Sequence, residues 1–147
     1  MTPSPHGEDP HPRVLVVDDE PIIRRVLVRV LDEAGFRTAS ADYGVTAVGV
    51  VQSTPHPFDL LVTDIRMPYM DGLDLARVMR NLSPSTPVLF ISGYAASNAL
   101  EDGMAGAPFL QKPFTTETFL ETIQFILADR DLNNRCSSNA VAFEGMR

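Results

Sequence analysis

The stretch Val14-Leu15-Val16-Val17-Asp18-Asp19-Glu20 decides the fold class. Four apolar residues run without interruption into three acids. This run lacks the alternation expected of a strand that faces water on one side. Two further runs of the same kind follow, Leu60–Val62 and Val88–Ile91. Uninterrupted apolar runs of this length are typical of strands buried in a parallel sheet.

Segments with helical spacing separate these runs. Apolar residues from Ile22 to Leu31 repeat near the 3.6-residue period, and this helix is expected to end at Gly35. The remaining expected elements are a weaker strand Phe36–Ala41, helices Val45–Gln52 and Leu73–Met79, a fourth helix within Tyr94–Gly106 that Gly103 and Gly106 weaken, a strand Phe109–Gln111 and a final helix Thr116–Ala128.

Five strands alternating with five helices predict an α/β fold with a doubly wound parallel sheet. Parallel strands need crossover connections, and these are right-handed in nearly every known case, so helices are expected on both faces of the sheet. The chain has 147 residues, of which 44% are hydrophobic, enough for one globular domain. We expect that domain at 13–129, with flexible tails at 1–12 and 130–147.

Composition and charge exclude several classes of function. The net charge is −7 and the basic residues are scattered, which argues against a surface that follows a nucleic-acid backbone. No apolar run approaches the roughly 20 residues that a membrane-spanning helix needs, and the polar, proline-rich first residues lack a signal core. These features predict a cytoplasmic protein without direct contacts to nucleic acid or membrane.

Reactive side chains follow the expected strands, where the carboxyl ends of parallel strands meet at one edge of the sheet. Any one of them could simply cap a helix, as Asp19 before Pro21 could. Crowded carboxylates, however, repel one another unless a cation lies among them, and Mg²⁺ is a cation that prefers oxygen ligands. The residues at these strand ends are Asp18, Asp19, Glu20, Asp64, Ser92 and Lys112.

This set of groups suits phosphoryl chemistry. With a metal ion neutralising charge, one carboxylate can act as the nucleophile toward phosphorus and form an aspartyl phosphate. Lys112 and Ser92 could then bind the phosphoryl oxygens.

Four sequence blocks resemble those of response-regulator receiver domains of two-component signalling. They are VLVVDDE from Val14, DLLVTDIRMPYMDG from Asp59, VLFISGY from Val88 and FLQKPF from Phe109. The resemblance spans about residues 13 to 129, and four blocks in order are far more specific than one short motif. It implies a flavodoxin-like sheet with strand order 2-1-3-4-5.

The resemblance also implies a role for each acidic residue of the site. Asp64 is expected to accept the phosphoryl group. Asp18 and Asp19 are expected to hold Mg²⁺ together with Asp64 and the backbone carbonyl of Arg66, with Asp19 as the closer acidic ligand. Such a domain is a phosphoacceptor that signals, with only autocatalytic phosphotransfer and self-dephosphorylation of its own.

A conformational switch is implied in the same way. Ser92 is expected to be the switch hydroxyl, Lys112 the charge partner of the phosphate, and Phe109 the aromatic side chain that changes rotamer when Ser92 is drawn in. The Lys112–Pro113 peptide bond is expected to be cis.

The implied partners are proteins. A histidine kinase or a histidine phosphotransfer protein is expected to supply the phosphoryl group. A downstream protein is expected to bind the face formed by Tyr94–Gly106, the final strand and the last helix, and the same face could pair two copies of the chain.

Three alternative functions were compared with a free-standing receiver. The chain could be the receiver of a hybrid histidine kinase, whose motif blocks look similar. A haloacid-dehalogenase-like phosphohydrolase would need a second acid where Arg66 stands. A DNA-binding regulator would need an effector domain that the residues after the expected domain are too few to form.

Overall fold

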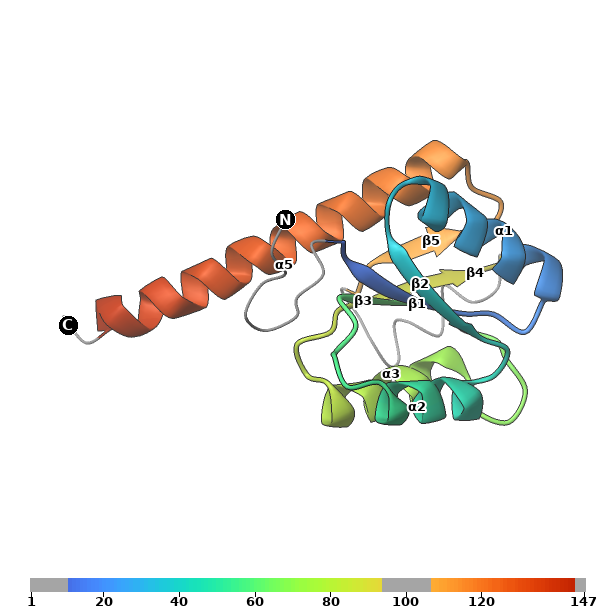
Figure 1. Ribbon diagram of the computed structural model, residues 1–147, viewed down its shortest axis with the longest axis horizontal. Helices are drawn as coiled ribbons and strands as arrows, with labels where there is room; N and C mark the ends of the chain where they lie inside the picture. The colour runs from blue at the N-terminus through green and yellow to red at the C-terminus, as the bar shows by residue number, and fades with distance from the viewer. Residues whose placement is uncertain (1–10, 94–106, 145–147) are drawn as a thin grey trace. The chain divides into compact units, whose positions relative to one another are not determined.

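The computed structural model describes residues 11–93 and 107–144, with side chains described as far as Asp131. Its centre is a parallel sheet of five strands in the order β2-β1-β3-β4-β5 (Figure 1). The predicted fold class and strand order are therefore confirmed. The strands are β1 Arg13–Val17, β2 Arg37–Ala41, β3 Leu60–Asp64, β4 Val88–Ser92 and β5 Phe109–Gln111.

The register of the strands brings their carboxyl ends level at one edge of the sheet. Val17 at the end of β1 pairs with Ala41 of β2 on one side and with Thr63 of β3 on the other. Farther along the sheet, Asp64 pairs with Ile91, and Ser92 pairs with Gln111. Because neighbouring strands lie about 4.8 Å apart, residues that follow these positions are held within a few strand spacings of each other.

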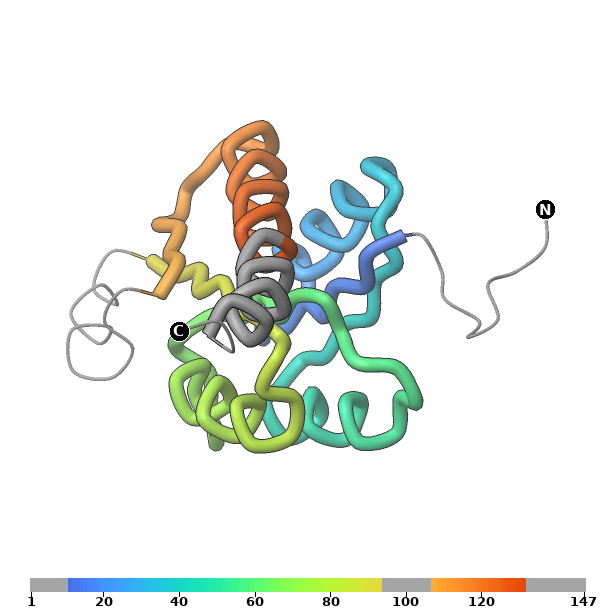
Figure 2. Tube along the Cα trace, turned by 90° about the vertical axis from the view of Figure 1, so that its left-hand side faces the viewer, coloured from blue at the N-terminus to red at the C-terminus, as the bar shows by residue number. Residues whose placement is uncertain are grey.

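Helices flank the sheet on both faces. Helix α1 (Pro21–Glu33) lies on one face, and helices α2 (Gly44–Ser53) and α3 (Gly72–Leu82) lie side by side on the other (Figures 1 and 2). The expected fourth helix falls within Tyr94–Gly106, which lies outside the described residues.

Within the described residues, two buried clusters hold the sheet to its helices. The larger joins β1 and β3 to α2 and α3 and includes Leu15, Leu61, Leu75 and Met79. Burying such side chains is the main stabilising contribution, about 1.5–3 kcal/mol for each large apolar group. The smaller cluster contains Ile65, Leu73, Ala76 and Phe90, and Phe109 packs against it.

The helix ends follow the local sequence. Pro21 occupies the first turn of α1, where a missing N–H costs nothing, and the helix stops before Gly35, whose φ of 96° favours glycine. Helix α3 is capped by Asp71, whose side chain accepts a 2.8 Å hydrogen bond from the Asp74 amide. The end of α1 at Gly35 was predicted.

Helix α5 (Thr116–Glu144) is longer than predicted. The predicted end at Ala128 is wrong, because the helix continues to Glu144. The flexible tail expected at 130–147 stays a prediction. The sequence contains no proline and no glycine between Pro113 and Gly145, so nothing in it stops the helix earlier. The limits of the domain at 13 and 129 stay a prediction.

None of the helices in the described parts of the chain combines the length and the apolar character that crossing a bilayer requires.

Candidate functional site

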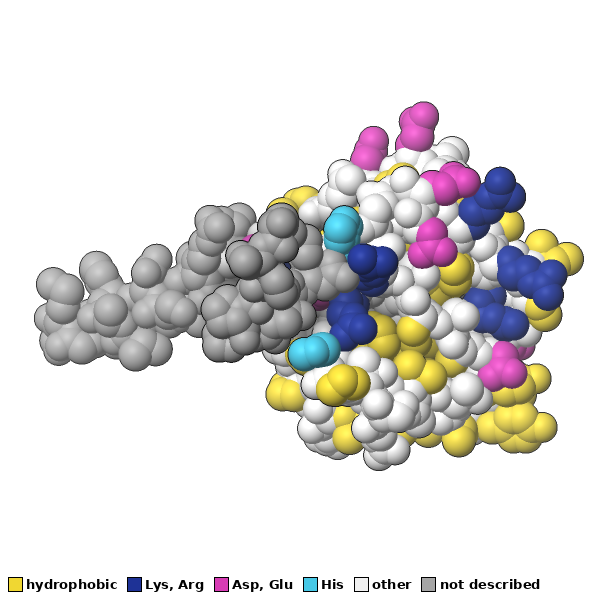
Figure 3. Space-filling model, in the orientation of Figure 1, with side chains coloured by type: hydrophobic (Ala, Val, Ile, Leu, Met, Phe, Trp, Pro, Cys, Tyr) yellow, Lys and Arg dark blue, Asp and Glu magenta, His cyan; other side chains and the backbone are white. Residues whose placement is uncertain are grey.

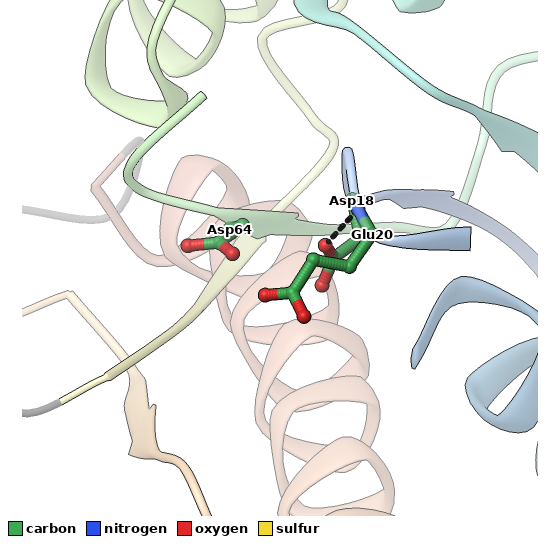
Figure 4. Close-up of side chains that lie close together, drawn as sticks. All are labelled: Asp18, Glu20 and Asp64. Atoms are coloured by element: carbon green, nitrogen blue, oxygen red, sulfur yellow. Dashed lines mark hydrogen bonds between the residues drawn. The ribbon is translucent and has the colours of Figure 1, made fainter. Parts of the chain in front are cut away.

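Three carboxylates meet at the carboxyl edge of the sheet. Asp18 follows β1 and Asp64 ends β3, which is the neighbouring strand, so the sheet itself holds these two side chains together. Glu20 comes from the turn after β1, and carboxylate oxygens of the three residues lie within 4.8 Å of one another (Figure 4). Asp18 is fully buried, Asp64 is 5% exposed, and Glu20 is exposed.

Lys112 places a positive charge between these acids. Its Nζ lies 3.1 Å from Asp18 Oδ2 and 3.0 Å from Asp64 Oδ2, and 3.9 Å from Glu20 Oε1. The backbone amide of Lys112 donates a 2.7 Å hydrogen bond to the Ser92 carbonyl, which fixes the end of β5 beside the end of β4. The Lys112–Pro113 peptide bond is cis, as predicted.

Backbone amides bind the other oxygen of each buried acid. The Glu20 amide donates to Asp18 Oδ1 at 2.9 Å, and the Arg66 amide donates to Asp64 Oδ1 at 3.2 Å. In both cases the donor lies two residues after the acid, so each aspartate closes a local turn of its own. The two aspartates therefore have the same arrangement, with one oxygen on a backbone amide and the other on Lys112.

Burial and charge act in opposite directions on the ionisable groups of the site. Burial raises the pKa of Asp18, and the Glu20 amide and Lys112 only partly offset this effect. Burial also acts to lower the pKa of Lys112, but hydrogen bonds and charges from Asp64 and Asp18 outweigh it, so the pKa of Lys112 is raised. Lys112 therefore remains positively charged, whereas burial disfavours the ionised form of Asp18.

The loop from Ile65 to Gly72 connects Asp64 to α3 and is closed at its base. The Gly72 amide donates a 2.7 Å hydrogen bond to the Ile65 carbonyl. A Cβ on residue 72 would collide with the Asp64 carbonyl oxygen and lie 2.9 Å from Ile65 Cα. Only glycine permits this approach, so α3 begins directly against the backbone that carries Asp64.

Arg24 holds the turn on the opposite side of the site. Its guanidinium donates a 2.7 Å hydrogen bond to the Asp18 carbonyl. This bond ties the first turn of α1 to the residue that follows β1.

A nearly buried carboxylate can act as a nucleophile toward an electrophilic centre. The neighbouring lysine can then stabilise negative charge that develops on the group being transferred. The sequence model of the response regulator receiver domain matches residues 14–124, which include all of these side chains. The chain is a response regulator receiver domain.

Known receiver proteins agree with this assignment. The response regulator receiver protein CpdR of Brucella abortus is 38% identical over 117 residues, covering 78% of this chain and 96% of that protein. The sensor kinase CckA of the same organism is 35% identical over 122 residues, covering 80% of this chain but only 13% of the kinase. A crystal structure of a receiver protein from Sinorhizobium medicae has a TM-score of 0.74 at 32% identity and covers 82% of this chain and 98% of its own.

Most residues that the sequence predicts for the receiver site do lie together. Asp18 and Asp64 each accept a hydrogen bond from Lys112. Ser92 ends the strand next to β3 and is buried, and Phe109 is half-buried and paired with Phe90 of β4. Their predicted roles as switch hydroxyl and switch aromatic remain predictions.

One placement differs from the predicted metal site. Among the described residues, the cluster of convergent acids contains Glu20 and not Asp19, which is half-buried. Glu20 was among the acids expected at the strand ends but had no predicted role. The tight turn closed by Asp18 could have identified it, because such a turn brings the residue two positions on back over the strand end. The Arg66 side chain is exposed, and the metal-binding role predicted for its carbonyl stays a prediction.

Proposed function

We propose that this receiver domain accepts a phosphoryl group on Asp64 from a phosphohistidine of a partner protein, in a reaction that depends on Mg²⁺. The observation that carries the proposal is the pairing of Asp64 with Lys112 at the carboxyl edge of the sheet. Receiver domains are signalling domains that work with histidine kinases or phosphotransfer proteins, and we place this chain in such a pathway in the cytoplasm.

Exposure favours Asp64 over Asp18 as the nucleophile. Asp18 is fully buried, while Asp64 retains 5% exposure at the end of β3. A phosphorus atom must approach a carboxylate oxygen closely before a bond can form. Asp64 is therefore the more accessible of the two carboxylates, and Asp18 then serves to hold Lys112.

The proposed transfer is a displacement at phosphorus. An oxygen of Asp64 attacks the phosphorus of phosphohistidine, and the new P–O bond forms as the P–N bond breaks. The electron pair of the broken bond leaves with the imidazole nitrogen, which takes a proton from solvent. Lys112 lies beside the attacking carboxylate of Asp64 and can bind a phosphoryl oxygen by a charge-assisted hydrogen bond.

The acidic cluster fits Mg²⁺. Asp18, Glu20 and Asp64 offer carboxylate oxygens within 4.8 Å of one another, close to the roughly 4.2 Å that separates opposite ligands around this ion. All the donors are hard oxygens, as Mg²⁺ requires. When bound, the ion would supply positive charge to the phosphoryl oxygens. We include Asp19 and the Arg66 carbonyl in the proposed ligand set on the resemblance alone, and add Glu20 on its position.

Phosphorylation would act as a switch by changing local charge. A phosphoryl group brings close to two negative charges beside Lys112 and Ser92. New hydrogen bonds to those charges would shift the population of conformers, with Ser92 and Phe109 as the moving side chains. The protein then signals by binding a partner, and its own chemistry is limited to accepting and losing the phosphoryl group.

A second candidate is a receiver that belongs to a hybrid histidine kinase. The match to a segment of CckA that makes up 13% of that kinase favours it. The chemistry at Asp64 would be the same in both cases, and the two differ in whether the phosphoryl donor is part of the same protein.

Intact mass after incubation with phosphoramidate tests the proposal. One phosphoryl adduct is expected with Mg²⁺, and none without Mg²⁺ or in Asp64→Asn. Asp74→Asn is the matched control, because Asp74 is an exposed acid on α3 that pairs with Arg77 and should leave labelling intact. An adduct that persists in folded Asp64→Asn would refute Asp64 as the acceptor, and no adduct in the unaltered protein would refute the proposed function.

A further inference from the structure

The loop between Asp64 and α3 carries an aromatic side chain at its tip. Tyr69 is 90% exposed, and its φ of 71° is in the left-handed region that residues other than glycine rarely adopt. Among the described residues it is the only non-glycine residue with a positive φ. An exposed ring on an unfavourable backbone conformation gives little to the stability of its own domain.

Two further residues, Tyr43 and Val45, form an uncharged surface together with Tyr69. Tyr43, just before α2, meets the Tyr69 ring edge-on, with ring centroids 5.8 Å apart and an interplanar angle of 82°. Val45 in the first turn of α2 is also largely exposed. We call Tyr43, Val45 and Tyr69 the tyrosine patch. Figure 3 shows hydrophobic side chains at the lower right of the molecule, where Figure 1 places the start of α2 and the loop before α3.

The patch has no charge of its own, although the chain as a whole carries a net charge of −7. Helix α2, on which Val45 lies, contains no charged residue from Gly44 to Ser53. Tyrosine is enriched at protein–protein interfaces and among the residues that contribute most to binding there. An uncharged contact surface also avoids electrostatic repulsion between this acidic chain and a partner that is acidic as well.

We propose that the tyrosine patch receives the protein that donates the phosphoryl group, with Tyr69 as a residue that determines which donors are accepted. This inference rests on the proposed function, because it requires transfer to Asp64. It assigns Tyr69 to recognition of the donor and leaves the transfer chemistry to Asp64 and Lys112.

Distance along the chain places Tyr69 within the area that a donor must cover. Tyr69 is five positions beyond Asp64 in the sequence, so the two Cα atoms lie at most about 18 Å apart. The hydrogen bond from the Gly72 amide to the Ile65 carbonyl closes the base of the loop and shortens this distance further. A protein interface of standard size covers about 800 Å² per partner, equivalent to a disc of roughly 16 Å radius. A donor protein centred on Asp64 therefore reaches Tyr69.

The experiment compares two phosphoryl donors on the full chain. Phosphoramidate is small and needs only the site around Asp64. The protein donor is a histidine kinase of the source organism, autophosphorylated with ATP and chosen from a set of such kinases because it labels the unaltered protein fastest. Tyr69→Gly removes the ring and suits the positive φ, so folding is preserved. Tyr69→Phe keeps the ring, and Leu82→Ala removes an exposed apolar side chain at the far end of α3.

In Tyr69→Gly, transfer from the kinase is expected to slow by about tenfold or more, as for loss of an interface anchor. Labelling by phosphoramidate should be retained. Tyr69→Phe and Leu82→Ala should accept from the kinase at the rate of the unaltered protein.

Two results would overturn the inference. One is transfer from the kinase to Tyr69→Gly at the unaltered rate. The other is an equal loss with both donors, which would place Tyr69 within the transfer site itself. If the unaltered protein forms dimers, and Tyr69→Gly abolishes them while kinase transfer is unchanged, the patch binds a second copy of the chain instead. Failure of phosphoramidate to label the unaltered protein would count against the proposed function and not against the patch alone.

Discussion

Replacing Gly72 by alanine tests how closely α3 approaches the phosphoacceptor strand. The new Cβ would collide with the Asp64 carbonyl oxygen and lie 2.9 Å from Ile65 Cα and 3.0 Å from the Asp64 carbonyl carbon. All three neighbours are backbone atoms, so no side chain can rotate away to relieve the contact. The end of β3 or the start of α3 must move instead.

The cost follows from the size of this collision. Forcing one extra methyl group into a closely packed site typically costs 1–3 kcal/mol, so we expect Gly72→Ala to lower the free energy of unfolding by about 2 kcal/mol. With a urea m-value of roughly 2 kcal/mol per molar, the unfolding midpoint should fall by about 1 M. Because Asp64 moves with its backbone, phosphoramidate labelling should also slow.

Gly49→Ala is the matched control. Gly49 lies inside α2, is exposed, and has nothing within 4 Å of the position where a Cβ would be. Here alanine should raise the free energy of unfolding by about 0.5–1 kcal/mol, because glycine is a poor residue inside a helix. Urea unfolding of both variants provides the measurement. Equal stability of Gly72→Ala and the unaltered protein would refute the close packing of α3 on β3.

Three further predictions concern the acids and the caps. Asp18→Asn should raise the free energy of unfolding in metal-free buffer at pH 7 by about 1 kcal/mol, since it removes a charge that burial disfavours. Because the pKa of Asp18 is raised in the folded protein, its contribution to stability is greatest below the unfolded pKa of 3.8 and declines as pH rises through the folded pKa. The gain in stability of Asp18→Asn should therefore vanish in acid. A gain that does not depend on pH would contradict this cause. Lys112→Met should destabilise the protein by about 3 kcal/mol at pH 7 and less at pH 4, because the raised pKa of Asp18 lets that carboxylate take up a proton there. Urea unfolding at the two pH values measures this, and equal losses would show that Lys112 acts by packing. Asp71→Ala should cost about 1 kcal/mol in thermal unfolding by removing the cap of α3, while an unchanged melting temperature would mean that solvent replaces the cap.

The chain order of apolar runs and helical spacings was enough to predict the sheet. Val14–Val17 and Val88–Ile91 are uninterrupted, and the structure places both as interior strands that are buried along most of their length. The edge strand β2 was harder to recognise, because its residues Arg37–Ala41 are partly exposed and only Ala41 is buried. A strand buried on two faces gives an uninterrupted apolar run in the sequence, and a partly exposed strand gives a weaker pattern.

The site divides in the same way. Asp18, Asp64 and Lys112 follow strands directly, so their meeting could be predicted from the parallel sheet alone. Glu20 could not be placed by that rule, since it depends on the turn that Asp18 closes with the Glu20 amide. The position of Tyr69 depends on a positive φ, which no apolar pattern reports. The length of α5 was underestimated because polarity was taken as the end of a helix where no stop residue is present.

The closed loop from Ile65 to Gly72 separates two kinds of evolutionary change. Its base is fixed by one hydrogen bond and one close backbone approach, while its tip extends into solvent. Substitutions at the tip can therefore accumulate without moving the residues at the base. A signalling protein built in this way can be redirected to another pathway, by selection or by design, while its reactive centre is inherited unchanged.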